Sequence, residues 1–134
     1  SSMLRSSLGR CYLAFCPDDE REQIVAGLMR SRDPADQAGM RSAELTRMIG
    51  QVRAQGYATR DARHTSADSP ERFGALAVPL YMGERVAGAL CVVWISALAS
   101  ETGIAQAHLR DLQRLAGEIG VRWQNGLEAN PSLR

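Results

Sequence analysis

Three cysteines are the side chains of this 134-residue sequence best able to do covalent chemistry: Cys11, Cys16 and Cys91. A thiol reacts as its thiolate, so a reactive cysteine needs a lowered pKa, for example beside Arg10 or at a helix end. All three stand among apolar neighbours, and free cysteine is one of the most buried residue types. Packing is therefore the favoured interpretation, with Cys91 in mid-strand a core or pocket residue. An odd number of cysteines without a CxxC pair predicts neither a disulfide framework nor a zinc site.

Two neighbouring hydroxyls, Ser6 and Ser7, precede a predicted helix. Such hydroxyls cap helices by accepting a hydrogen bond from a backbone N–H of the first turn. The same end of the helix, with these hydroxyls and Arg5 or Arg10 beside it, could instead bind the carboxylate of a ligand. The sequence leaves both interpretations open.

No common enzyme motif accompanies these residues, because Walker, GxGxxG, HExxH and GxSxG patterns do not occur in the sequence. His64 and His108 lie in a polar loop and near a helix start, away from any acidic pair at metal-ligand spacing. We interpret both histidines as solvated. We therefore expect no metal, no cofactor and no catalysis.

The first two helices that must position these groups meet at Pro17. Residues 6–15 carry apolar side chains at helical steps of three and four, and the proline ends that helix. Three acidic residues, 18–20, supply the negative charge favoured at the start of the next helix. The stripe that this second helix is expected to bury consists of Ile24, Val25, Leu28 and Met29.

Two further helices are predicted. Ser42 suits the N-cap and Gly56 the end of a helix with apolar residues at i, i+3, i+4 and i+7. The last helix starts near Gln106 and keeps one apolar face for about five turns. That face consists of Leu109, Leu112, Leu115, Ala116, Ile119, Trp123 and Leu127. Trp123 is accordingly expected in the core, whereas Trp94 could be a core residue, a pocket wall or an interface anchor.

The clearest β signal is a hairpin. Apolar runs at residues 75–81 and 86–95 flank the short, glycine-containing stretch 82–85. Pro79 cannot donate to a β-ladder, so its strand needs an edge or a bulge there.

Little further strand is predicted. Residues 57–63 alternate weakly, and residues 31–39 and 64–71 are polar loops. Helices beside a three-stranded antiparallel sheet give an α+β fold in two layers. So small a sheet has exposed edges and little face to cover, so further strands are expected outside this chain.

The composition fits a single folded domain. The chain is 45% hydrophobic, and its 16 basic residues, all arginine, against 15 acidic ones leave a net charge of +1. A near-neutral chain without a basic cluster is unsuited to phosphate backbones, so we do not expect it to bind DNA by itself. Neither a membrane-spanning run nor a signal peptide is present, so we expect a cytoplasmic location and no membrane partner.

Four short motifs follow one another along the chain. They are LRSSLGRCYLAF at residues 4–15, VRAQGYA at 52–58, GALAVPL at 74–80 and GERVAGAL at 83–90. In the same order they resemble the elements T/S-x-x-G-[KR]-x-x-L-A, R-x-x-G-Y-A, G-x-x-A-I-A-V-P-[VI] and G-x-V-x-G-A-L. These elements belong to the effector-binding domain of IclR-type bacterial transcriptional regulators. Each motif is weak alone, but together they cover nearly all of residues 3–127.

The resemblance implies a GAF-like antiparallel sheet with flanking helices, which binds a small organic acid as effector. It also implies a homo-oligomer, a dimer or a tetramer, and an N-terminal winged helix-turn-helix domain through which alone the protein would contact DNA. The family's effector domain begins with further strands and a helix. Residues 3–128 would then be a partial effector-binding domain, residues 1–2 a stub and residues 129–134 a tail.

Seven residues occupy the positions of the family's ligand contacts. They are Ser7 and Leu8 in the first helix, Arg60 or Asp61 after Gly-Tyr-Ala, Ala75 in the first hairpin strand, and Cys91 and Val93 in the second. Many relatives have serines at the last two positions and an acidic run where this chain has TRDAR, residues 59–63. An apolar floor with an arginine nearby suits a larger or aromatic carboxylate. Residues 4–17 also read most like regulators of aromatic-acid catabolism, such as the hydroxyphenylpropionate type.

Two other functions are compatible with the sequence. A thiol enzyme of the methionine-sulfoxide-reducing kind on a GAF-like fold would require an exposed cysteine of low pKa. A ligand-free assembly domain would require only an apolar helix stripe. A polar-lined cavity at Ser7, Arg60 and Cys91 would count against the assembly domain.

Overall fold

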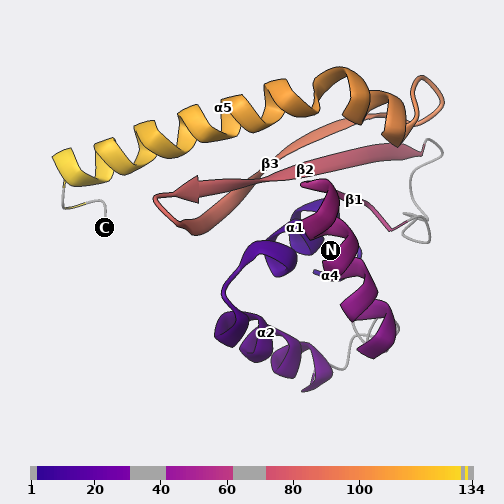
Figure 1. The fold of residues 1–134 in the computed structure, drawn as a ribbon, viewed down its shortest axis with the longest axis horizontal. Helices are drawn as coiled ribbons and strands as arrows, with labels where there is room; N and C mark the ends of the chain where they lie inside the picture. The colour runs from indigo at the N-terminus through magenta and orange to yellow at the C-terminus, as the bar shows by residue number, and fades with distance from the viewer. Residues whose placement is uncertain (1–2, 31–41, 62–71, 131, 133–134) are drawn as a thin grey trace.

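Helices lie on both faces of a small antiparallel sheet in the computed structural model, which describes residues 3–30, 42–61, 72–130 and 132 (Figure 1). In chain order the elements are α1 (Ser7–Phe15), α2 (Asp18–Arg30), α4 (Ser42–Gln55), β1 (Ala58–Thr59), β2 (Phe73–Met82), β3 (Arg85–Ile95) and α5 (Glu101–Ala129). The strand order is β1-β2-β3, and neighbouring strands are antiparallel. In Figure 1 the sheet runs between α5 above it and α1 and α4 below it. The predicted α+β class is confirmed, but the two-layer arrangement is wrong because both faces of the sheet carry helices.

β2 and β3 form the hairpin that the sequence predicts. Gly83 lies in the turn between the strands with φ +65, a conformation that favours glycine. β1 pairs with β2 only at residues 76–77, so no strand of the described residues pairs with β2 on that side at Pro79. The register with β3 shifts just beyond the proline, between Leu80 and Tyr81. The expected edge or bulge at Pro79 is therefore confirmed.

Side chains alternate along the strands and divide the core in two. Facing α5, the buried cluster consists of Leu76, Val78, Ala105 and Ala116. Facing α1 and α4, it consists of Cys11, Ala14, Val52, Ala58 and Ala77. α5 approaches β2 so closely that a Cβ atom on Gly120 would stand 2.0 Å from the carbonyl oxygen of Tyr81. The sheet is thus the partition between two separate cores.

Trp94 belongs to the α5 side of this partition. It packs against the α5-facing cluster, and a Cβ atom on its cross-strand partner Gly74 would stand 2.4 Å from its ring. Its indole N–H donates to the carbonyl of Ala99 at 2.9 Å. Of the three interpretations of Trp94, the core one describes this packing.

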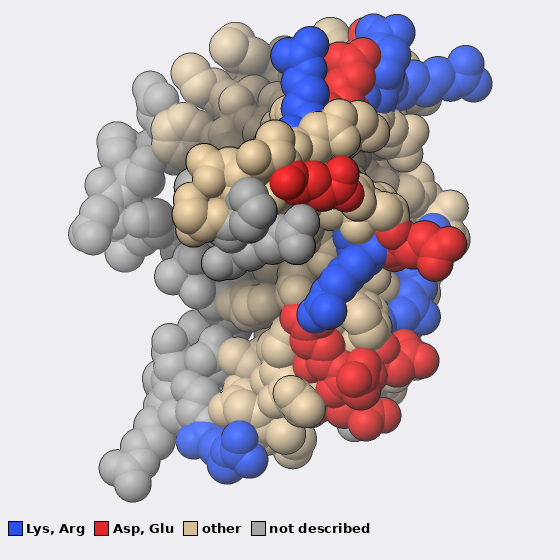
Figure 2. Space-filling model, turned by 90° about the vertical axis from the view of Figure 1, so that its left-hand side faces the viewer, with Lys and Arg blue, Asp and Glu red and all other residues tan. Residues whose placement is uncertain are grey.

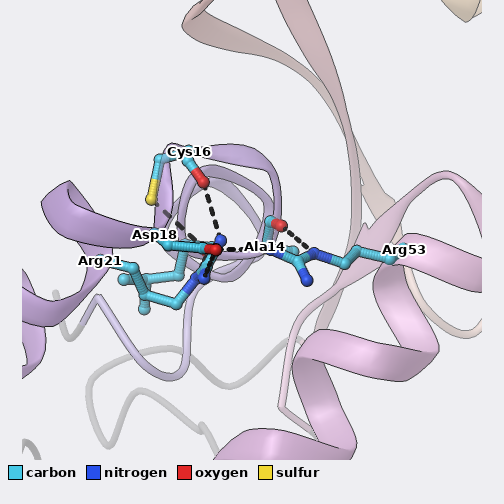
Figure 3. A network of polar contacts seen from close by, with 6 residues as sticks. Ala14, Cys16, Asp18, Arg21 and Arg53 are labelled. Atoms are coloured by element: carbon cyan, nitrogen blue, oxygen red, sulfur yellow. Dashed lines mark hydrogen bonds and ion pairs between the residues drawn. The ribbon is translucent and has the colours of Figure 1, made fainter.

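Two arginines hold the C-terminal end of α1. Arg21 of α2 donates from Nε to the carbonyl of Leu13 at 2.6 Å and from Nη2 to that of Cys16 at 2.7 Å. Arg53 of α4 donates from Nε to the carbonyl of Ala14 at 2.6 Å (Figure 3). The last carbonyls of a helix have no partner within it. Here guanidinium groups from two other helices supply that partner.

Asp18, the first residue of α2, completes this network (Figure 3). Its carboxylate lies 2.7 Å from Nη1 of Arg21 and 3.6 Å from Nη2 of Arg53. The hydrogen bond and charge of Arg21, with a further contribution from Arg53, hold the pKa of Asp18 below its usual range. The carboxylate therefore stays ionised beside the two arginines.

Several predictions from the sequence are wrong, either about which residues are buried or about where a helix or strand begins and ends. α2 has no buried residue, and Met29 of its expected stripe is 64% exposed. Trp123, expected in the core, is 46% exposed on α5. Of the weak strand expected at residues 57–63, the structure describes residues 57–61, and there only the two residues of β1 form a strand. α5 begins at Glu101, earlier than the expected Gln106.

Some expectations fall outside the residues that the structure describes, namely the loops at 31–39 and 64–71 with His64. His108 is described and is exposed on α5, as interpreted. Within the described ranges, no helix combines the length and apolar character needed to cross a membrane.

Candidate functional site

α1 brings Ser7 against β3. Ser6 caps the helix, since its Oγ accepts a hydrogen bond from the N–H of Gly9 at 3.1 Å. Ser6 is therefore the capping residue, and the hydroxyl of Ser7 is available for another contact. Ser7 is only 4% exposed, and its Oγ lies 3.3 Å from the Sγ of Cys91. Two of the predicted ligand contacts, far apart in sequence, therefore touch.

Small apolar side chains form the sheet surface beside this serine–cysteine pair. Ala75 pairs with Val93 and Ala77 with Cys91 across the hairpin, so these four residues share the face toward α1. Ala75 and Ala77 are buried, whereas Cys91 is half-buried and Val93 is 60% exposed. The β3 part of this face is therefore accessible next to the start of α1, and four of the seven predicted contacts gather there.

Arg60 and Asp61 follow β1, and backbone bonds fix both of them. The N–H of Arg60 donates to the carbonyl of Ala75 at 3.4 Å, and its Nη1 donates to that of Phe73 at 3.1 Å. The N–H of Asp61 donates to the carbonyl of Arg5 at 2.9 Å, in the turn before α1. Arg60 is thus held at the start of β2, and Asp61 beside the start of α1.

Asp61 also lines a cleft of about 280 Å³ between the start of α1 and α4. The other lining residues are Leu4, Arg10, Glu44, Leu45, Arg47, Met48 and Gln51. Arg10 is anchored there, because its Nη1 donates to the carbonyl of Thr59 at 2.7 Å. The sequence reasoning missed Arg47 and Gln51. Their i, i+4 spacing on the polar side of the predicted helix is the signal that could have found them.

Two of the three thiols, those of Cys11 and Cys16, lack the environment that a nucleophile needs. Cys11 is fully buried, and burial, reinforced by nearby Cys91, raises its pKa to about 12. Burial also raises the pKa of Cys16, against the opposing charge of Arg21. A thiolate at either position is therefore disfavoured at neutral pH. Among the described residues, no group of three or more histidine, cysteine or acidic side chains could hold a metal ion.

No protein-family model matches the chain. The C-terminal domain of the E. coli transcriptional regulator KdgR has a TM-score of 0.67 at 20% identity, covering 91% of this chain and 71% of that one. Thermotoga maritima IclR has a TM-score of 0.68 at 18% identity, covering 91% of this chain and 47% of that one. The chain has the fold of an IclR-type C-terminal domain.

A third solved structure carries a ligand. It is a double mutant of the inducer-binding domain of PobR from Acinetobacter in complex with 3-hydroxybenzoic acid, with a TM-score of 0.66 at 16% identity. The likeness covers 88% of this chain and 65% of that one. By contrast, the chain spans about half the length of several longer regulators that it resembles, 46–47% in each. The common fold therefore belongs to one part of those proteins.

Proposed function

We propose that this chain is the effector-binding and oligomerisation domain of a bacterial IclR-type transcriptional regulator and responds to an organic carboxylate. One observation carries the proposal: the 3.3 Å contact between Ser7 and Cys91, two residues that the family motifs assign to ligand binding. Residues 3–128 are a partial effector-binding domain, followed by a tail at residues 129–134. A separate N-terminal winged helix-turn-helix domain contacts DNA, and the protein works in the cytoplasm without catalysing a reaction.

The start of α1 is the proposed carboxylate-binding end. Gly9 and Arg10 donate their backbone N–H groups to Ser6, at its Oγ and its carbonyl respectively. The preceding N–H groups, those of Ser7 and Leu8, have no carbonyl one turn earlier within the helix. Within the described ranges neither N–H donates to a backbone carbonyl outside the helix, so both are left for an anion, and the helix dipole favours negative charge there. The side chain of Leu8 is 47% exposed, so its contribution is the backbone N–H.

The apolar face of the sheet is the proposed floor for the rest of the ligand. Ala75, Cys91 and Val93 present small side chains next to Ser7, and a flat ring fits against such a surface. Arg60 and Asp61 supply charged groups at the margin, where they can orient a polar substituent. The double mutant of the PobR inducer-binding domain, which has the same fold and is in complex with 3-hydroxybenzoic acid, supports an aromatic carboxylate.

Thermal shift and calorimetry with 3-hydroxybenzoate, 3-hydroxyphenylpropionate and short-chain keto acids test this proposal. A ligand at 100 times its Kd should add about 2.7 kcal/mol to the free energy of unfolding. Ser7→Ala should weaken the aromatic acids about tenfold, as expected from losing one well-placed polar contact of about 1.4 kcal/mol. Ser96→Ala, which removes an exposed hydroxyl bonded to the carbonyl of Arg72, is the matched control.

The outcomes separate the competing functions. No shift of the melting temperature with any carboxylate would refute the effector-binding proposal and favour a ligand-free assembly domain. Binding that Ser7→Ala and Ser96→Ala weaken equally would refute the assignment of Ser7. Rapid alkylation of a cysteine in the folded protein at neutral pH would revive the thiol enzyme.

A further inference from the structure

α2 is an amphipathic helix whose apolar side has little to pack on within the described part of the chain. None of its 13 residues is buried. Glu22, Val25, Ala26, Met29 and Arg30 recur at steps of three and four, so they follow one side of the helix. That side is acidic at one end, apolar in the middle and basic at the other.

A groove of about 630 Å³ runs between α2 and α4. Its lining is predominantly apolar and consists of Arg21, Glu22, Val25, Ala26, Met29, Leu45, Thr46, Ile49, Gly50 and Arg53. An added Cβ atom on Gly50 of α4, which lines the groove, would meet nothing within 4 Å. Two helix backbones approach closely where side chains are small, so this groove can accept another helix.

The charges of α2 are arranged for an antiparallel copy of itself. Its first turn holds Asp18, Asp19 and Glu20, and Figure 2 shows acidic side chains gathered over the start of this helix. Its last turn holds Arg30. Glu22 and Arg30 are exposed, and neither forms an ion pair with another residue of the described chain.

We propose that the groove binds α2 of a second copy of this chain, antiparallel across a twofold axis near Ala26. Glu22 and Arg30 are each four residues from Ala26, about 6 Å along the helix. The symmetry therefore sets Glu22 of each copy opposite Arg30 of the other, with Val25 and Met29 of both copies between the two ion pairs. An isologous contact requires a self-complementary surface of this kind.

Both helices of the groove are needed for a stable contact. A helix of 13 residues is about 20 Å long, and a standard interface buries about 800 Å² on each partner. α4 supplies the second wall through Leu45, Ile49 and Gly50. The inference develops the assembly part of the proposed function, but the groove shares no residue with the serine–cysteine site.

Sedimentation equilibrium of the full 134-residue chain tests the interface. The unaltered chain should dimerise, and Met29→Glu should raise the dimer dissociation constant at least about tenfold, because a charge enters the apolar centre. Met29 is 64% exposed, so the variant should fold normally by circular dichroism. Leu98→Glu, at a 79% exposed position in the loop before α5, is the matched control and should leave the dissociation constant unchanged.

Charge exchange identifies the antiparallel arrangement. Glu22→Arg and Arg30→Glu should each weaken self-association about tenfold, because each turns two symmetric attractions into repulsions. An equimolar mixture of these two variants should form heterodimers, and the double variant E22R/R30E should recover the original affinity. A chain that stays monomeric at all concentrations, or dimerises equally well as Met29→Glu, overturns the proposal. Carboxylate binding by a monomeric Met29→Glu chain separates this result from a failure of the effector-binding proposal.

Discussion

Helices α1 and α2 follow one another across Pro17, yet the molecule uses them in opposite ways. α1 has nine residues, and five of them are buried. It packs against one face of the sheet, together with α4. α2 has thirteen residues and none is buried. Their apolar patterns look equally helical in the sequence. The periodicity of apolar residues therefore indicates which side of a helix is able to pack, but not whether a partner within the chain covers it.

Shortening one apolar side chain in each helix should give the largest difference in the free energy of unfolding. Leu13→Ala in α1 should lower the free energy of unfolding by about 2–5 kcal/mol, because Leu13 is fully buried and a cavity remains. Met29→Ala in α2 should change it by less than about 0.5 kcal/mol at a concentration where the chain is monomeric. Urea denaturation measures both. Equal losses would mean that α2 is packed within one chain.

Replacing one glycine in each helix by alanine tests how closely other atoms approach the two helix backbones. A Cβ atom on Gly9 of α1 would stand 2.2 Å from the carbonyl oxygen of Met3, whereas one on Gly27 of α2 would meet nothing. Gly9→Ala should therefore lower the unfolding free energy by about 1–3 kcal/mol. Gly27→Ala should raise it by about 0.5–1 kcal/mol, because alanine favours the helix. Thermal denaturation gives the sign of each change, and two changes of the same sign would contradict the assignment.

The smallest expected effect concerns a hydrogen bond between one side chain of α1 and one of α2. Tyr12 of α1 donates its hydroxyl hydrogen to Oε1 of Glu20 in α2, and this bond, with burial, raises the pKa of Tyr12 to about 12. A raised pKa in the folded state stabilises the fold below the unfolded value, about 10, and this contribution is lost as the pH rises toward 12. Tyr12→Phe should flatten the fall in stability between pH 10 and 12. Denaturant midpoints measured at several pH values check it, and identical slopes for both chains would contradict it.

The elements of the fold could be predicted from local patterns. Helix steps beginning at Leu8, the capping Ser6 and the positive-φ positions Gly56 and Gly83 each act within a few residues, so the sequence carries them directly. The burial of a helix depends on what lies opposite it. Trp123 continues the apolar face of α5 in the sequence, but 46% of its surface is exposed in the structure.

The candidate site also has residues that the sequence identifies and residues that only the packing of the helices brings together. Ser7 and Cys91 could be named from motif positions, and their contact follows once α1 packs on β3. The spacing of Arg47 and Gln51 places them on one side of α4, but it does not show that this side lines a cleft, because the cleft forms only where α4 lies beside the turn before α1. Arg60 is expected within a strand at residues 57–63, yet it follows β1, and its guanidinium donates to the carbonyl of Phe73.

The positive charges that bind the carbonyls at the end of α1 all belong to arginine. Every cation that holds its last carbonyls is a guanidinium, and the whole chain contains no lysine. An ammonium could lose its proton at alkaline pH or be neutralised by acetylation, whereas arginine keeps its charge at any pH that a folded protein survives. Arg21 also reaches two carbonyls and a carboxylate at once, a fork that no single ammonium reproduces. Modification of amines therefore cannot loosen the end of α1. Within this network only the carboxylate of Asp18 can lose its charge, and that requires strong acid.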